Sequence, residues 1–213
     1  MSKTAGILMA LTLSAAALGA QADVLAPDAL IRQTADEVLT MVKQDKDMRS
    51  GNQKKLLDLV ETKVLPHFDF EKMTRLAVGR PWRSATAEQR QALVTEFRTL
   101  LVRTYTAAFS RYQDQKVEVK PPVKSDKRDD EVTVNTLIVK PGSPSIAVNY
   151  EMEKKDDGWK VFDLTIEGAS VIESYRGTFT DKVQQSGIDG LIKYLADKNH
   201  ANASQPLKKA DSK

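Results

Sequence analysis

Four side chains are the first candidates for chemistry in this sequence, because proton transfer needs carboxylates or imidazoles. Asp163 stands in an apolar stretch, residues 159–166, where its carboxylate could act as a general base in a pocket or could simply face solvent. Asp69 and Glu71 form a carboxylate pair, but their place at a predicted helix start favours a capping role. His67 lies alone in a helix connection, a setting typical of a structural or surface histidine.

The composition excludes much catalytic chemistry. The 213 residues include no cysteine and two histidines, which excludes thiol nucleophiles and thiolate metal sites and leaves little room for a zinc site or a histidine-based triad. No Gly-rich phosphate loop, G-x-S-x-G or H-E-x-x-H motif is present. The 32 basic residues nearly balance the 29 acidic ones, whereas a nucleic-acid binder normally carries a larger basic surplus. The sequence therefore argues against metal, thiol and nucleic-acid chemistry.

A compact basic and aromatic group is the main candidate for an anion contact. Arg80, Trp82 and Arg83 could receive a phosphate or an acidic partner surface, and Arg176 is a further candidate phosphate partner. The alternative is a helix connection in which Trp82 is packed as a plug. The charge run 126–131 is interpreted as a solvated loop.

The N-terminus has the three parts of a secretory signal: Lys3, an apolar run of about 14 residues, and a small-x-small end at residue 22. The run is too short to cross a bilayer of ~30 Å as a helix. An uncleaved anchor or a buried helix is the alternative. We expect residues 1–22 to be a cleaved signal peptide. No cysteine follows that site to carry a lipid anchor, so the mature protein should be soluble, not membrane-anchored, and located in a bacterial periplasm.

The first half of the mature chain has helical periodicity. Apolar residues recur at helical spacing from residue 28, and a break at residues 50–52 precedes a second helix that ends near residue 65. Asp69 is predicted to cap a third helix that ends at Gly79. The capping box of residues 86–89 is predicted to begin a long helix.

The second half changes to strand periodicity. Residues 117–119, 131–139, 146–152 and 159–166 predict about four strands, with a hairpin turn at Asp157-Gly158. Two more helices follow Gly168, interrupted at Gly187 and ending near residue 199. We expect residues 23–199 to form a single α+β domain, in which about six helices cover an antiparallel meander, and residues 200–213 to be a disordered polar tail.

Several motifs resemble those of a known family. The stretch 64–83 contains Phe68-Asp69-Phe70 followed by Met73-Thr74-Arg75-Leu76-Ala77 and Gly79-Arg80-Pro81-Trp82-Arg83. Residues 86–90, 174–176 and 187–192 continue the pattern in the same order and spacing. Together they resemble the toluene-tolerance family of MlaC-like periplasmic phospholipid carriers, over nearly all of residues 25–199.

The resemblance implies an NTF2-like curved sheet whose helices enclose a deep apolar pocket for phospholipid tails, with no catalytic residue and no cofactor. It also implies that the protein, expected to be a monomer, shuttles phospholipid between two partners and so maintains the lipid asymmetry of the outer membrane. These partners are an outer-membrane lipoprotein–porin complex (MlaA-like) and an inner-membrane transporter complex with a ring of MCE domains (MlaD-like).

An acyl pocket must be deep and dry, because two tails of about 15 methylenes each would cost on the order of 24 kcal/mol in water. The long helix and the strand with Ile146, Val148 and Tyr150 offer facing apolar surfaces for it. Each such residue could equally belong to the ordinary core. The candidates for lining the tail pocket are Phe97, Leu101, Tyr105, Phe109, Val134, Ile146, Val148, Tyr150, Phe162, Leu164, Ile166 and Tyr175.

Two other classes of function stay open at this point. A pocket enzyme of isomerase or dehydratase type would use Asp163 or a tyrosine as its base, and would need convergent polar groups in the pocket. A periplasmic chaperone or adaptor would grip apolar polypeptide and carry no stoichiometric lipid.

Overall fold

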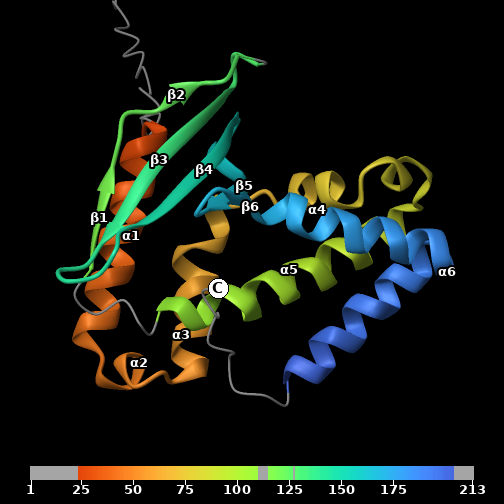
Figure 1. The fold of residues 1–213 in the computed structure, drawn as a ribbon, viewed down its shortest axis with the longest axis horizontal. Helices are drawn as coiled ribbons and strands as arrows, with labels where there is room; N and C mark the ends of the chain where they lie inside the picture. The colour runs from red at the N-terminus through yellow and green to blue at the C-terminus, as the bar shows by residue number, and fades with distance from the viewer. Residues whose placement is uncertain (1–23, 110–114, 127, 204–213) are drawn as a thin grey trace, which may run out of the picture.

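One antiparallel sheet forms from the second half of the chain (Figure 1). The computed structural model describes residues 24–109, 115–126 and 128–203. The strand order is β1-β3-β4-β5-β6, with β2 also pairing with β3. The strands are β1 (Lys116–Val119), β2 (Val123–Lys124), β3 (Glu131–Val139), β4 (Ile146–Lys155), β5 (Gly158–Ile166) and β6 (Ala169–Ser170). The predicted four-strand meander corresponds to β1, β3, β4 and β5, whereas the two-residue strands β2 and β6 were not predicted.

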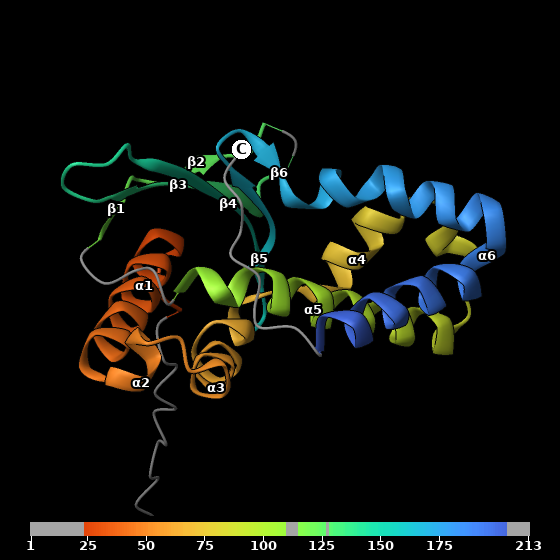
Figure 2. The ribbon, with the colours of Figure 1, turned by 60° about the horizontal axis from the view of Figure 1, so that its bottom comes forward.

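Helices from both ends of the chain pack against this sheet. Figure 2 shows α1 and α3 below it, and α4 and α6 extending away beside it. Helix α1 contacts β1 and β3, whereas α4 and α6 contact β5. The helices are α1 (Pro27–Gln44), α2 (Lys46–Arg49), α3 (Gln53–Lys63), the 3-10 turn η1 (Leu65–His67), α4 (Phe70–Val78), the 3-10 turn η2 (Arg80–Ser84), α5 (Ala87–Phe109) and α6 (Val171–Ala203). The predicted α+β class is confirmed.

Local sequence signals set several of these boundaries. The Asp69 carboxylate accepts a hydrogen bond from the backbone N–H of Lys72 at 2.8 Å and caps α4. Thr86 and Gln89 form the reciprocal capping box before α5, each side chain accepting from the other residue's backbone N–H at 3.2 and 3.1 Å. Gly79 ends α4 with a φ of 70°, a conformation that L side chains rarely adopt. These predicted roles of Asp69, Gly79 and the capping box are confirmed.

The interruption predicted at Gly187 divides α6 into two segments. Gly187 has φ 70° and ψ −173°, and Ser186 before it is also non-helical. The turn folds the second segment back, so that Leu191 and Leu195 are fully buried in the cluster that also contains Phe97. The turn at Gly187 therefore allows the second segment of α6 to pack into the core beside α5.

The ends of the chain differ in part from the predicted boundaries. Helix α6 continues to Ala203, four residues past the predicted limit at 199. The predicted signal peptide and residues 204–213 of the predicted tail lie outside the described residues.

A buried ion network joins α4 to the sheet. Lys72 is 7% exposed, and its Nζ lies 2.7 Å from a carboxylate oxygen of Glu131 and 3.3 Å from one of Glu153. The same Nζ lies 3.5 Å from the centroid of the Phe162 ring. Interpreting residues 126–131 as a solvated loop was therefore wrong at its last position, because Glu131 begins β3 and is paired with a buried cation.

Replacing Gly187 with alanine should destabilise the protein by ~1–3 kcal/mol, because its φ and ψ lie in a region that is essentially restricted to glycine. Gly177 is the matched control, since it lies exposed in α6 with nothing within 4 Å of an added Cβ. Gly177→Ala should stabilise by ~0.5–1 kcal/mol through helix propensity. Urea unfolding measures both changes, and equal effects of the two substitutions would contradict the role given to Gly187.

The Glu153 carboxylate should make stability depend on acid pH. Burial raises its pKa, but the hydrogen bond from Lys155 and the charge of Lys72 outweigh burial and hold the pKa below its ordinary value of 4.5. A lowered pKa in the folded state contributes stability above pH 4.5, and that contribution is lost as the pH falls through the lowered pKa.

We therefore expect Glu153→Gln to be less stable than the natural protein at neutral pH. This gap, the difference between their free energies of unfolding, should become smaller below pH 4.5. Urea unfolding at a series of pH values measures the gap. Glu118→Gln, at an exposed position on β1, is the control and should show no such gap. A Glu153→Gln gap that stays constant with pH would contradict this account of the network.

Candidate functional site

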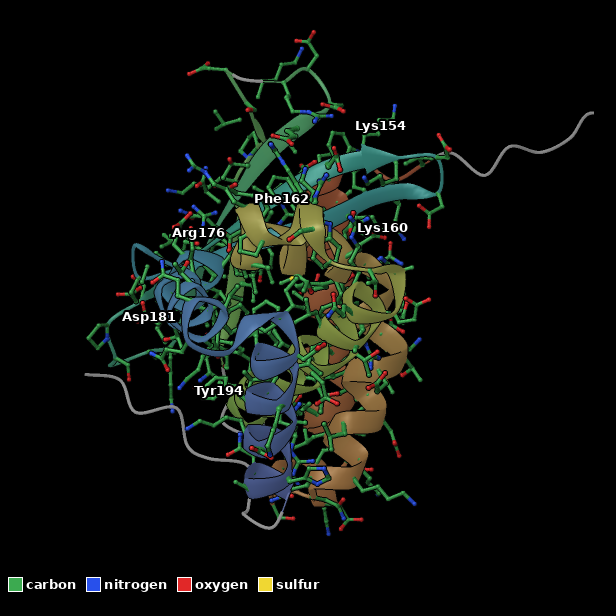
Figure 3. The ribbon with its side chains drawn as sticks, turned by 90° about the vertical axis from the view of Figure 1, so that its right-hand side faces the viewer. Lys154, Lys160, Phe162, Arg176, Asp181 and Tyr194 are labelled. Atoms are coloured by element: carbon green, nitrogen blue, oxygen red, sulfur yellow. The ribbon has the colours of Figure 1, made fainter. Side chains whose placement is uncertain are left out.

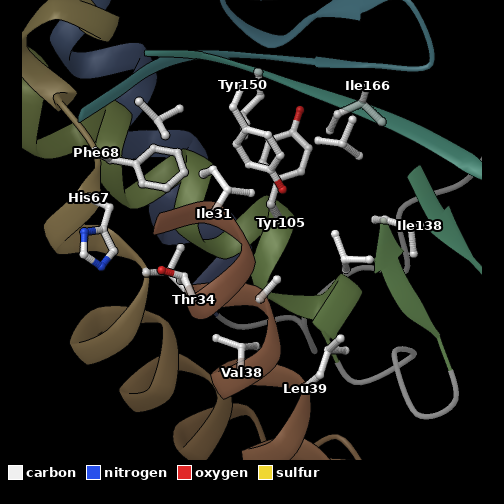
Figure 4. A pocket seen from close by; sticks show the side chains of 16 residues that line it. Ile31, Thr34, Val38, Leu39, His67, Phe68, Tyr105, Ile138, Tyr150 and Ile166 are labelled. Carbon is white, nitrogen blue, oxygen red and sulfur yellow. The ribbon is translucent and has the colours of Figure 1, made fainter. Parts of the chain in front are cut away.

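An apolar cavity of about 190 Å³ lies between the sheet and α1 (Figure 4). Its wall is built from α1, the α3–η1 segment, α5, and strands β1, β3, β4 and β5. In the close-up, Ile31, Phe68, Tyr105 and Tyr150 gather around the middle of the cavity, and Ile138 lies on the far side from His67. The lining residues are Ile31, Thr34, Ala35, Val38, Leu39, Val64, His67, Phe68, Tyr105, Val117, Ile138, Val148, Tyr150, Val161, Leu164 and Ile166.

Strand alternation builds the sheet side of this wall. Val148 pairs with Ile166, and Tyr150 pairs with Leu164, so these four side chains share one face of the sheet. Between Glu151 and Met152 the register of β4 and β5 shifts by one residue. Because such a bulge reverses the faces beyond it, Val161 lines the cavity.

Helix α1 builds the opposite side of the wall. Its residues Ile31, Thr34, Val38 and Leu39 recur at helical spacing and so lie on one face, toward the cavity. The sequence indicated this apolar stripe, but no residue of α1 was predicted to line the pocket. An amphipathic stripe alone does not distinguish a helix that packs directly on the sheet from one that leaves space beneath it.

The few polar groups in this wall are uncharged at neutral pH. Burial lowers the pKa of His67 below its ordinary value of 6.5, and the nearby positive charge of Lys160 adds to this effect. Burial likewise raises the pKa of Tyr105 to about 12. No aspartate, glutamate, lysine or arginine is among the lining residues. The cavity therefore suits a long apolar group and offers nothing to a buried charge.

A second apolar cavity, of about 100 Å³, lies next to the first, between α3, α4, α5 and β5. Four residues, Val64, Phe68, Tyr105 and Leu164, line both cavities. The other residues that line the second cavity are Val60, Leu65, Phe70, Met73, Leu101, Val102, Thr106 and Val171.

Half of the residues predicted for the tail pocket line one or both of these cavities. Tyr105 and Leu164 line both, Val148, Tyr150 and Ile166 line the larger, and Leu101 lines the smaller. Their contact with lipid stays a proposal.

The other predicted tail residues lie elsewhere. Phe97 and Tyr175 pack edge to face at 5.1 Å inside the core between α5 and α6. Val134 of β3 is fully buried in the core cluster that also contains Ile31 and Val161, and Ile146 is 38% exposed at the start of β4. Phe162 lines a separate polar cavity beside Lys72, because the bulge removes it from the alternation that its spacing suggested. The side chain of Phe109 lies outside the described residues.

The predicted anion-binding residues do not line either apolar cavity. Trp82 is 6% exposed in the helical core, in agreement with its alternative interpretation as a plug, and the Arg80 and Arg83 side chains beside it are exposed. Arg176 donates two hydrogen bonds, at 3.0 and 3.2 Å, to the carbonyl of Leu76 and pairs with Glu173. Figure 3 shows Arg176 near Phe162, beside α4.

Asp163, the candidate general base, faces away from the apolar cavities and caps α6. Its carboxylate accepts hydrogen bonds from the Ser170 hydroxyl at 2.6 Å and from the Ile172 backbone N–H at 3.2 Å. It also accepts from the N–H of Leu164 at 2.7 Å. Asp163 lines the polar cavity that also holds Lys72 and Arg176, on the other side of the sheet. This geometry gives Asp163 a structural role in joining β5 to α6.

Within residues 24–109, 115–126 and 128–203, no group of three or more histidine, aspartate or glutamate side chains is arranged to hold a metal ion. No helix in the same ranges is both long and apolar enough to cross a membrane.

Comparison with known proteins gives relatives along most of the chain. A protein of Haemophilus influenzae, the intermembrane phospholipid transport system binding protein MlaC, is 26% identical over 184 residues, covering 85% of this chain and 84% of that protein. Toluene tolerance protein ttg2D of Pseudomonas putida is 24% identical over 189 residues, covering 85% and 87%.

A solved structure is also similar to this chain. It is the phospholipid-binding protein from Ralstonia solanacearum in complex with a phospholipid, which matches with a TM-score of 0.75 at 35% identity. The match covers 83% of this chain and 98% of the solved one. The family model for the MlaC protein matches residues 32–197. Since that model spans most of the sequence, the chain belongs to the MlaC family, and the resemblance predicted from its motifs is confirmed.

Proposed function

We propose that this protein is a phospholipid carrier that encloses acyl tails between its sheet and α1. The observation that carries the proposal is the larger cavity, whose walls are apolar and uncharged. The solved relative at 35% identity holds a phospholipid, which supports the same cargo here. No catalytic role is assigned, because the candidate base Asp163 caps α6 instead of facing the cavity.

The cellular role proposed for the carrier follows from its family and its N-terminal sequence. Residues 1–22 serve as a cleaved signal peptide, and the mature protein is a soluble periplasmic monomer. It carries phospholipid between an outer-membrane lipoprotein–porin complex (MlaA-like) and an inner-membrane MCE-domain transporter (MlaD-like). This transport maintains the lipid asymmetry of the outer membrane. The binding-protein relative of an intermembrane phospholipid transport system supports this role.

The walls must move apart when a lipid enters. The two cavities, about 190 and 100 Å³, are each smaller than the ~300–1,000 Å³ of pockets that hold drug-sized ligands. A diacyl phospholipid is larger than such ligands. The space must therefore expand, and α1 is the wall element best placed to move, because it packs on the edge half of the sheet, β1 and β3.

Headgroup selectivity should be slight. Neither apolar cavity has a lysine or arginine in its lining, and Arg176 is already engaged by the Leu76 carbonyl and Glu173. Zwitterionic and anionic phospholipids with the same tails should therefore compete within about tenfold of each other, or ~1.4 kcal/mol. Competition is read by mass spectrometry of the folded complex, and a larger preference would contradict this expectation.

A charge in the larger cavity should abolish lipid carriage and leave the fold intact. Val148 is 8% exposed and lines the cavity as the third residue of β4. An aspartate there would lose its hydration against a bound tail, at several kcal/mol per ion, whereas water can reach it in the empty protein. We expect Val148→Asp to fold, as judged by circular dichroism, and to purify without lipid in native mass spectrometry.

The matched control is Ile146→Asp, which introduces the same charged residue two positions earlier on β4, where the side chain is 38% exposed. This variant should keep a full lipid load. If Val148→Asp is folded and still carries as much lipid as Ile146→Asp, the larger cavity does not hold the tails.

A further inference from the structure

The two apolar cavities meet at a partition formed by Phe68 and Tyr105. Both side chains line both cavities, together with Val64 and Leu164. Tyr105 comes from α5, and Phe68 comes from the segment between η1 and α4. The space beneath the sheet is therefore two arms that share four residues.

The partition is attached to the sheet. Phe68 forms a parallel β-bridge with Val161 of β5, and the backbone N–H of Asp69 donates to the Val161 carbonyl at 2.9 Å. The ring of Phe68 also stacks on that of Phe70, with centroids 5.9 Å apart. These contacts hold Phe68 from both sides, so we expect it to keep its place when the arms widen.

Both arms have apolar linings that suit an acyl chain, but the two arms differ in volume. The larger has a volume of about 190 Å³ and the smaller about 100 Å³. The hydroxyl of Thr106 in the smaller arm is 1% exposed and has no hydrogen-bond partner among the described residues. No charged residue lines this arm, so it can accept methylenes and offers no ion pair to a headgroup.

We propose that the two tails of one phospholipid separate at Phe68 and Tyr105, the longer entering the arm beside α1 and the shorter entering the arm between α3, α4 and α5. This proposal rests on the proposed function. It makes Phe68 and Tyr105 the residues that set which pairs of tails fit. A single cavity that held both tails side by side would show no preference for unequal tails.

The natural protein tests the proposal without any substitution. Stearoyl–lauroyl and dipentadecanoyl phosphatidylglycerol carry the same number of tail carbons and the same headgroup, and differ only in how the carbons are divided. Each methylene left in water weakens binding about fourfold. In competition from mixed vesicles of the two lipids, read by native mass spectrometry, we expect the unequal lipid to win by at least about fourfold. Equal binding, or preference for the equal tails, would overturn the proposal.

Two substitutions test the arms separately. Val102 lines only the smaller arm, and Ala35 lines only the larger. Val102→Phe should fill the smaller arm and reduce the load of dipalmitoyl phosphatidylglycerol at least about tenfold, while single-tailed palmitoyl lysophosphatidylglycerol still binds. Ala35→Phe is the complementary substitution in the larger arm, and should likewise reject the two-tailed lipid and keep the single-tailed one.

Circular dichroism checks that both variants fold. If either one fails to fold, the competition between equal-tailed and unequal-tailed lipids in the natural protein tests the proposal instead. A folded Val102→Phe protein with a full load of the two-tailed lipid would overturn the proposal. So would a natural protein that holds two phospholipids and loses one of them in Val102→Phe. A natural protein that binds neither lipid would instead contradict the proposed function itself.

Discussion

An apolar space inside a protein surrounded by water persists only if its walls are held apart by contacts outside it, because burial of apolar surface favours collapse. In this chain the polar contacts that fix the position of the sheet lie on its far side, away from the cavity. Lys72 of α4 is buried between Glu131 of β3 and Glu153 of β4. Asp163 of β5 ties the strand to the start of α6. The helical layer is thus attached to the sheet through polar groups, and the opposite face is left free to border a cavity.

The two faces of the sheet therefore have different chemistry. The face toward α1 carries Val148, Leu164 and Ile166 and borders an uncharged cavity, whereas the other face borders a cavity with Lys72 and Asp163 in its wall. A cargo with long apolar tails fits the first face and is excluded from the second. Separating the ion pairs from the cargo also means that a lipid can enter and leave without breaking them.

The signals readable in the sequence were local ones. Asp69, Gly79, Gly187 and the capping box at residues 86–89 act through their immediate neighbours, so they predicted helix boundaries correctly. The lining of the cavities depends on tertiary geometry, and only half of the residues predicted to line the tail pocket line either cavity.

Two features of the tertiary structure explain why some of the predicted residues do not line the cavities. Phe97 and Tyr105 belong to one drifting stripe of α5, and only the placement of α6 buries Phe97 in the core. Phe162 had the spacing of Leu164 and Ile166, but a one-residue bulge, which no residue type predicts, placed it on the other face.

Carriage of phospholipid is measured by isolating the protein from its host without detergent and determining the lipid phosphorus on each folded chain. We expect one phospholipid on each chain, and a folded protein free of lipid would show that it is not a phospholipid carrier.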